Sequence, residues 1–234
     1  MPADPPEELP FLFHRAHRSL DDGAHLELSL VGGIAADRLA DLVAGAGWVP
    51  LGAPTAGAAD DRPVTRLTVE RHHTLADSVG PGMRLLVCGI NPSPYSADVG
   101  VGYGRPGNRF WPAALLAGIV PVDRDPAAAL AAGTGMTDFA KRPTPRAAEV
   151  TRAEYEAGFA RVGRLAAWLR PGAVCFVGLS GWRTVVDRSA VAGVQPDAIG
   201  GRPAYVMPST SGLNARTPPA VLADHLAAAW ELGA

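Results

Sequence analysis

Apolar residues in this chain follow two spacings, and the two spacings alternate over most of its length. Strands are predicted at 84–90, 173–178 and 203–207, where the sequence is almost entirely apolar, as is typical of strands covered on both faces. Apolar residues at helical spacing occur around 108–117, 126–132, 151–169, 179–187 and 218–232. The longest of these predicted helices begins with a capping box, formed by Thr151 and Glu154. Strands that alternate with helices predict a three-layer α/β domain with a central, mainly parallel sheet over residues 76–234.

The first 75 residues follow a different pattern. Apolar and polar residues alternate over 25–31 and again over 64–70, which predicts two half-buried strands. Between them, 35–47 has helical spacing, and 51–62 is predicted to be a loop. We therefore expect residues 1–75 to form a small βαβ-like α+β module, preceded by an irregular or partly helical arm. A unit of this size is too small to be very stable alone, so it should pack on the rest of the chain.

Charge is distributed unevenly between these two parts. Residues 1–80 hold 12 Asp and Glu against 6 Arg, whereas residues 81–234 hold 11 against 15 Lys and Arg. A mildly basic part joined to an acidic one suggests that only the larger part approaches a polyanion. Chance variation on solvated faces explains the same asymmetry equally well, so charge alone does not decide the function.

Composition excludes several classes of protein. With 47% apolar and 19% charged residues the chain should be globular, and no apolar run reaches the ~18 to 20 residues of a membrane span. The N-terminus is acidic and rich in proline, unlike a secretory signal. Cys88 and Cys175 lie in apolar runs and are interpreted as buried thiols of a cytoplasmic protein. No His or Cys has the spacing of metal ligands, so we expect neither a metal nor a cofactor.

Two loops are predicted at the carboxyl ends of strands, where α/β proteins form their binding sites. One begins at Asn91 and the other spans 208–214. The carboxamide of Asn91 has no useful pKa, but it can hold a water molecule by hydrogen bonds. Tyr103, between glycines, offers a flat face on which a planar ligand could stack. From the residues alone, the alternative stays open that Asn91 only caps a turn and that Tyr103 only covers a loop.

Three segments then resemble one family, in the order in which that family has them. They are GINPSPYSADVGVGYGRPGNRFW at 89–111, GMTDFAKRPTPRAAEVT at 135–151 and MPSTSGLNAR at 207–216. Together they are similar to the motifs of the mismatch-specific uracil-DNA glycosylases, the family that includes thymine-DNA glycosylase. The resemblance covers roughly residues 75–232.

The resemblance implies a role for each matched residue. Asn91 would place the water that attacks the sugar C1′, and Tyr103 would stack on a base flipped out of the duplex. Backbone amides near Ile90 and Tyr103 would stabilise the departing base anion. Pro92 and Ser96 would complete the base pocket.

The resemblance also implies contacts to the rest of the DNA. Leu213 would enter the gap that the flipped base leaves, and Gly212 and Asn214 would contact the opposite guanine. The implied contacts to the DNA backbone are made by Ser209, Ser211, Arg142, Arg146 and Arg216.

The sequence departs from the family pattern at three places. Ser93-Pro94 replaces Gly-Leu and should stiffen the loop without moving Asn91. Ser96 stands where relatives have Ser or Ala, and it should crowd the 5-methyl group of thymine. Thr210 replaces the more common Pro or Ser, with little expected consequence. Asp98 and Asp138 are interpreted as polar loop residues.

These observations predict a monofunctional glycosylase of base excision repair. It would hydrolyse the N-glycosidic bond of uracil, with thymine or cytosine adducts as further candidates, opposite guanine in double-stranded DNA. Lys141, the single lysine, lies outside the two site loops, so no lyase step is expected. We expect a cytoplasmic, nucleoid-associated monomer whose N-terminal module packs on the domain or binds a protein partner. Two alternatives stay open: a lesion-binding protein of the same fold that does not cut, and a hydrolase of free nucleosides.

Overall fold

The structure analysed is a computed structural model that describes residues 6–212 and 217–234. Its larger part is built on a five-stranded sheet in the order β6-β5-β7-β9-β8, in which the first four strands are parallel and β8 is an antiparallel edge. The strands are β5 (Leu85–Gly89), β6 (Thr134–Asp138), β7 (Ala173–Val177), β8 (Gly193–Val194) and β9 (Ala204–Met207). The predicted α/β fold with a mainly parallel central sheet is confirmed.

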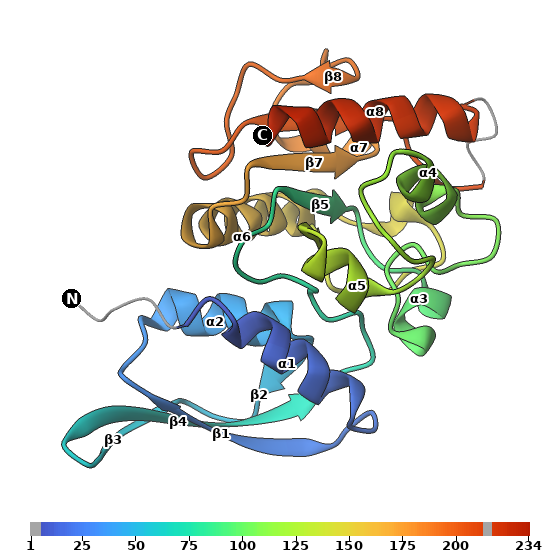
Figure 1. Ribbon diagram of the computed structural model, residues 1–234. Helices are drawn as coiled ribbons and strands as arrows, with labels where there is room; N and C mark the ends of the chain where they lie inside the picture. Colours follow the sequence, from blue (N-terminus) through green and yellow to red (C-terminus); the bar gives the residue numbers. More distant parts are fainter. Residues whose placement is uncertain (1–5, 213–216) are drawn as a thin grey trace.

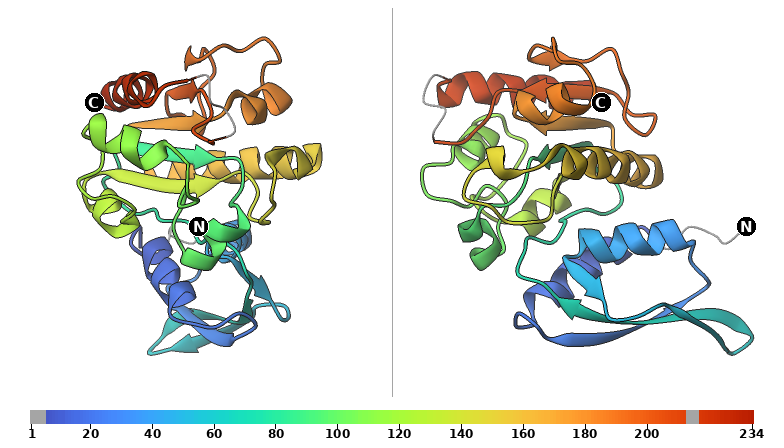
Figure 2. Two further views of the ribbon diagram at one scale, coloured as in Figure 1. Left: turned by 90° about the vertical axis from the view of Figure 1, so that its right-hand side faces the viewer. Right: turned by 180° about the vertical axis from the view of Figure 1, so that it is seen from behind.

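Helices cover both faces of this sheet, as Figures 1 and 2 show. The residues of β5 alternate between the two faces: Leu85 and Val87 pack with α4 (Phe110–Leu116) and α8 (Pro219–Leu232), and Leu86 and Cys88 pack with α6 (Arg152–Leu169) and α7 (Leu179–Val185). All four side chains are fully buried, which explains the continuous apolar run in the sequence. The helices are α3 (Pro94–Val99), α4 (Phe110–Leu116), α5 (Pro126–Ala131), α6 (Arg152–Leu169), α7 (Leu179–Val185) and α8 (Pro219–Leu232), with a 3₁₀ turn η1 (Ala147–Glu149) before α6.

The N-terminal part is an α+β unit, as predicted, but its sheet is antiparallel, so the two predicted strands pair directly in opposite directions and not as the parallel strands of a βαβ unit. β4 (Arg62–Arg71) pairs antiparallel with β1 (His25–Val31), β2 (Trp48–Pro50) and β3 (Thr55–Ala59). The predicted loop at 51–62 contains β3, which returns into β4 through Asp60 and Asp61. Both aspartates have positive φ, at 48° and 59°, which is the geometry of a two-residue hairpin turn.

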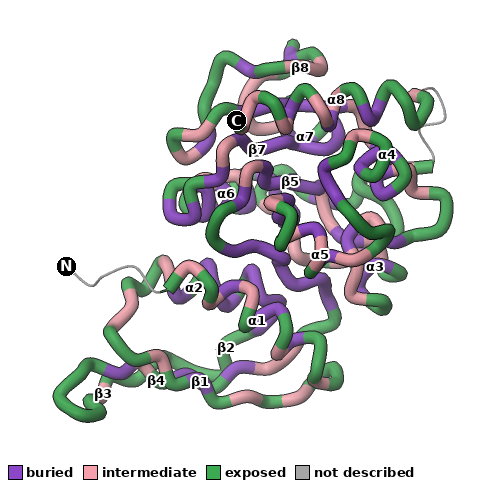
Figure 3. Tube along the Cα trace, in the orientation of Figure 1, coloured by how far each residue is buried: buried purple, intermediate pink, exposed green. Residues whose placement is uncertain are grey.

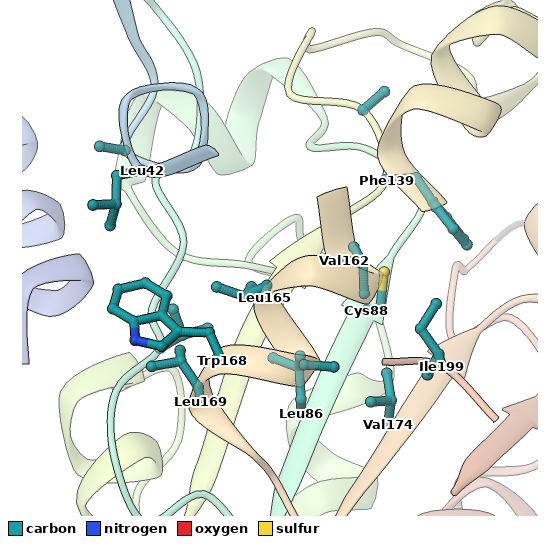
Figure 4. Close-up of a cluster of buried hydrophobic side chains, with 14 of the residues drawn as sticks. Leu42, Leu86, Cys88, Phe139, Val162, Leu165, Trp168, Leu169, Val174 and Ile199 are labelled. Atoms are coloured by element: carbon teal, nitrogen blue, oxygen red, sulfur yellow. The ribbon is translucent and has the colours of Figure 1, made fainter. Parts of the chain in front are cut away.

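Two helices, α1 (Leu9–Arg18) and α2 (Ala36–Gly45), lie between this sheet and the larger domain (Figures 1 and 2). The outer face of the N-terminal sheet is largely exposed (Figure 3). On its inner face, Trp48 and Leu42 belong to the same buried cluster as Leu165 and Trp168 of α6. Figure 4 shows this cluster reaching from α2 to the strands of the central sheet. The expectation that the small module packs on the rest of the chain is therefore confirmed.

Strand β6, at one end of the five-stranded sheet, is a second difference, because its sequence predicts a loop. Its two threonines interrupt any apolar run, but each is satisfied inside the fold. Thr134 Oγ1 donates to the carbonyl of Ile119 at 2.7 Å, and Thr137 Oγ1 donates to Asp77 Oδ1 at 2.8 Å. Buried polar side chains with such partners cost little, so a strand that looks polar can occupy an interior position.

Candidate active site

A cavity of about 500 Å³ opens at the carboxyl ends of the parallel strands. It lies where the two loops singled out by sequence meet, together with the segment after β6. The residues that line it include Leu75, Ile90, Asn91, Pro92, Ser96, Tyr103, Arg105, Asp138, Thr144, Arg146, Ser209 and Ser211. The structure therefore brings together most of the residues that the sequence predicts for base binding and catalysis.

The side chain of Asn91 is held in one orientation. Its Nδ2 lies 2.8 Å from Thr144 Oγ1 and 3.1 Å from the carbonyl oxygens of both Pro92 and Arg142. Thr144 donates its own hydroxyl proton to the carbonyl of Arg146 at 2.8 Å, so its oxygen is an acceptor toward Asn91. Because all three partners are acceptors, only the NH2 group fits there, and Oδ1 remains as the hydrogen-bond acceptor of the carboxamide.

The segment after Asn91 folds into a short helix that the sequence did not predict. Ser93 caps α3 by accepting the N–H of Ser96 at 3.1 Å, and Pro94 occupies the first turn, where a proline is favourable. The Ser93-Pro94 departure is thus a helix start. It turns Ser96, which is 3% exposed, into the wall of the cavity, where its hydroxyl bonds Ser93 Oγ at 3.1 Å.

Tyr103 lies in the left-handed backbone region, with φ of 57°. Non-glycine residues rarely adopt this conformation, and those that do cluster at functional sites. One face of the Tyr103 ring stacks on Phe110, with ring centroids 4.2 Å apart, while the residue lines the cavity. Stacking of a base on Tyr103 consequently stays a prediction, and it has to use the other face of the ring.

Asp138 is the residue whose importance the sequence interpretation missed. It ends β6 directly beside Gly89 and lines the cavity, and it is 7% exposed. Burial raises the pKa of its carboxyl group to about 6, with a smaller contribution from the negative charge of Asp77. A pKa near neutrality in a cavity is a typical property of catalytic groups. The missed signal was strand β6, which carries Asp138 to the same sheet edge as Asn91.

The second predicted loop, residues 208–214, borders the cavity through Ser209 and Ser211. Arg109 holds this loop, since its Nη2 donates to the carbonyl of Ser211 at 3.1 Å and its backbone N–H to that of Thr210 at 3.0 Å. Gly212 lies against Gly107, where a Cβ would come within 2.8 Å of the carbonyl oxygen. Leu213, Asn214 and Arg216 lie outside the described residues.

The arginines predicted to contact phosphate differ in their surroundings. Arg142 is engaged with Glu154, at 2.8 and 3.0 Å, and this pair lowers the pKa of Glu154 to about 2. A phosphate contact by Arg142 would have to exchange with this pair. Arg146 is 78% exposed at the side chain and lies 3.6 Å from Glu149, and Arg105 is an exposed residue at the same cavity, which sequence reasoning missed.

Within residues 6–212 and 217–234, no group of three or more His, Cys, Asp or Glu side chains is placed to hold a metal ion. Over the same ranges, no helix has the length and apolar character needed to cross a membrane.

An α/β sheet with a cavity at its carboxyl edge, an oriented carboxamide and a buried carboxyl group has the features of an enzyme active site. The family model of the uracil DNA glycosylase superfamily matches residues 76–232, and the chain belongs to this superfamily. Membership suggests an N-glycosylase activity on uracil and implies a DNA substrate. A solution NMR structure of a candidate uracil DNA glycosylase from Methanosarcina acetivorans is similar at 18% identity and a TM-score of 0.45. That match covers 69% of this chain and 98% of the other.

Proposed function

We propose that the protein is a monofunctional DNA glycosylase that removes uracil mispaired with guanine from double-stranded DNA. The observation that carries this proposal is the orientation of Asn91. Three acceptors fix its Nδ2, so Oδ1 is the atom of this cavity-lining side chain that would accept a hydrogen bond from a water molecule. A positioned water suits a reaction in which the glycosidic bond is largely broken before the nucleophile arrives.

In the proposed reaction, the water oxygen forms a bond to the sugar C1′ while the bond from C1′ to the base nitrogen breaks. The electron pair of that bond leaves with the base as an anion, and hydrogen bonds from backbone N–H groups near Ile90 and Tyr103 would stabilise it. The water must also lose a proton. Among the described residues that line the cavity, Asp138 is the one carboxylic acid, so we assign it as the proton acceptor.

This assignment predicts how activity depends on pH. Asp138 accepts a proton only when ionised, and burial raises its pKa to about 6. Cleavage should therefore be slow at pH 5 and rise until about pH 7. Receipt of the proton also makes Asp138 neutral while the base anion forms, which removes a repulsion between the two.

Two features support a preference among bases and substrates. Ser96 forms a buried wall of the cavity, with its hydroxyl tied to Ser93, so a 5-methyl group has little room and thymine should be a poorer base than uracil. Exposed Arg105 and Arg146 at the opening favour a polyanionic substrate over a free nucleoside. A mispaired base costs less to flip than a paired one, which favours uracil opposite guanine.

Single-turnover cleavage tests the proposal with oligonucleotides that carry U·G, U·A, T·G or single-stranded U. We expect fastest release from U·G and weak release from T·G. The Asn91→Ala variant should lose roughly a hundred- to a thousandfold in rate and still bind the duplex. Equal cleavage by Asn91→Ala would refute the role of Asn91. Binding without release of any of these bases would instead favour the lesion-binding alternative.

A further inference from the structure

A largely buried cluster of charged side chains lies next to Asp138, one of the residues that line the cavity. Asp77 is at its centre: Oδ1 accepts hydrogen bonds from Lys141 Nζ at 2.7 Å and from Thr137 Oγ1 at 2.8 Å, and Oδ2 accepts one from Arg161 Nη1 at 2.6 Å. The side chains of Asp77 and Arg161 are 5% and 8% exposed. Such a cluster is costly to bury unless every member is paired, and here each one is.

This cluster touches Asp138 from behind. Arg161 Nη2 donates to the backbone carbonyl of Asp138 at 2.7 Å. Lys141 Nζ lies 4.0 Å from Asp138 Oδ2 while it is hydrogen-bonded to Asp77. A small movement of the lysine would therefore turn the Asp138 carboxylate into the partner of a close ion pair.

The N-terminal module closes the cluster on its far side. The backbone N–H of Asp77 donates to the carbonyl of Gly45, the last residue of α2, at 2.7 Å. A Cβ at Gly45 would lie 2.6 Å from Asp77 Oδ2 and 3.2 Å from Arg161 Nη1, so the module and the cluster are in direct contact. Thr74 Oγ1, on the segment that joins the two parts, donates to the carbonyl of Lys141.

We propose that Asp77, held in place by the N-terminal module, is a positioning residue of the active site. It keeps Lys141 bonded to itself, so that the Asp138 carboxyl group faces the cavity instead of forming an ion pair with the lysine. The inference rests on the proposed function, and it gives the N-terminal module a part in the chemistry of the neighbouring domain.

Charge balance explains why Asp77 is needed. Lys141 and Arg161 each favour the ionised form of Asp138, and the negative charge of Asp77 opposes them. The other titratable groups near Asp138 are Tyr103 in the loop, Cys88 on β5 and His14 of α1, which lines a narrow cavity with it. These three are uncharged at neutral pH, because burial raises the pKa of Tyr103 and Cys88 and lowers that of His14 to about 4. Without Asp77, two cations would act on Asp138 alone.

The single lysine of the chain provides a direct probe of this cluster. Labelling with 15N-lysine gives one side-chain Nζ resonance, that of Lys141, whose shift should report the titration of Asp138. We expect a step near pH 6 that the Asp138→Asn variant lacks. In Asp77→Asn the step should move to lower pH by about one unit or more, because a neighbouring negative charge is lost.

A matched control separates this effect from looser packing of the module. Asp41 of α2 pairs with Arg164 of α6 at 2.7 and 2.8 Å, across the same contact between the two parts. Asp41→Asn should leave the step of Lys141 in place. An unchanged step in Asp77→Asn, or an equal shift in Asp41→Asn, would overturn the proposal.

The pH dependence of uracil release supplies a second readout, in which the two variants Asp77→Asn and Lys141→Met should shift in opposite directions. The acid limb of the pH–rate profile should move to lower pH in Asp77→Asn and to higher pH in Lys141→Met, whereas damage to the structure has no reason to act in opposite directions. If Asp77→Asn does not fold, the Lys141→Met variant still tests the proposal. An acid limb at the same pH in Lys141→Met as in the wild type would contradict it. If the wild-type protein releases no base at all, the titration of Lys141 remains informative, and the proposed function fails by itself.

Discussion

Both parts of the molecule are sheets with helices packed on them, but their strands run differently. The five-stranded sheet has four parallel strands, so their carboxyl ends share one edge, and the loop after β5 and the last residue of β6 bring Asn91 and Asp138 to one cavity. In the N-terminal antiparallel sheet, neighbouring strands end at opposite edges, and its loops are spread over both. Strand direction thus decides where polar groups from distant parts of the sequence can converge.

The largest contrast between the two sheets should come from a strand glycine in each. A Cβ at Gly89 of β5 would overlap the Asp138 carboxylate and lie 3.0 Å from the Tyr103 hydroxyl. Gly89→Ala should therefore displace both side chains and reduce uracil release roughly a hundredfold or more, as expected when preorganised groups move.

The matched variant is Gly57→Ala in β3. There the added Cβ meets the end of the Arg66 side chain, at 2.5 Å, and this side chain can move into solvent. Release should stay within about twofold of the wild-type rate, since surface changes of this kind usually alter stability by less than about 0.5 kcal/mol. Similar losses in both variants would show that the difference between the sheets does not govern activity.

A second contrast concerns buried ionisable groups and stability. The pKa of Asp138 is raised by burial from 3.8 to about 6, so between these values the folded protein holds a proton that the unfolded chain has lost. The free energy of unfolding should therefore decrease by up to about 3 kcal/mol as pH rises from 4 to 7. Asp138→Asn should remove this decrease and be more stable than wild type at pH 8, while losing activity. Urea unfolding at pH 4 and pH 8 measures the difference, and parallel pH profiles for both proteins would contradict it.

In the N-terminal module, buried histidines should change stability with pH in the opposite direction, with a loss at low pH. His14 and His17 of α1 are 4% and 2% exposed, and burial lowers the pKa of each to about 4. Both side chains bond backbone carbonyls of the joining segment, those of Ala76 and His72. The unfolded chain takes up protons below about pH 6.5 and the folded one does not, so stability should be lost as pH falls toward 4.

Removal of one histidine tests this sign. His14→Phe keeps an aromatic ring against Phe11, on which His14 now stacks at 5.4 Å. Its urea midpoint should fall less than that of the wild type between pH 7 and pH 5, by the equivalent of about 2 kcal/mol. An unchanged dependence on pH would mean that His14 does not titrate with unfolding.

The sequence predicted most of the parallel sheet correctly, because short and nearly continuous apolar runs are typical of strands that are buried on both faces. It failed at β6, where Thr134 and Thr137 find partners in distant segments that no local pattern reveals. Asp138 was missed for the same reason: a residue assigned to a loop cannot be paired with a neighbouring strand, so its position beside Gly89 could not be predicted. Asn91 and Ser96 could be predicted from motifs, whereas two of the three acceptors that orient Asn91 come from the segment after β6, and only the fold shows them.

The smallest expected effect concerns binding of the DNA backbone. Arg105 and Arg146 are exposed at the cavity, on loops of the parallel sheet, and Arg15 and Arg62 are exposed on the N-terminal module. If duplex DNA approaches the carboxyl edge of the parallel sheet, Arg105→Gln and Arg146→Gln should each weaken binding severalfold. Each should also reduce the slope of log affinity against log salt by about one, because one fewer counterion is released.

The variants Arg15→Gln and Arg62→Gln serve as the matched pair, since they remove the same charge from the other region. Their affinity and salt slope should equal those of the wild type when fluorescence anisotropy is recorded between about 50 and 200 mM salt. Equal losses in all four variants would mean that the whole surface attracts DNA without a preferred face. A loss confined to Arg15→Gln or Arg62→Gln would place the duplex on the N-terminal module, and the cavity would then need another substrate. The salt dependence of binding thus tests, without any catalytic measurement, whether the parallel sheet or the N-terminal sheet carries the functional surface.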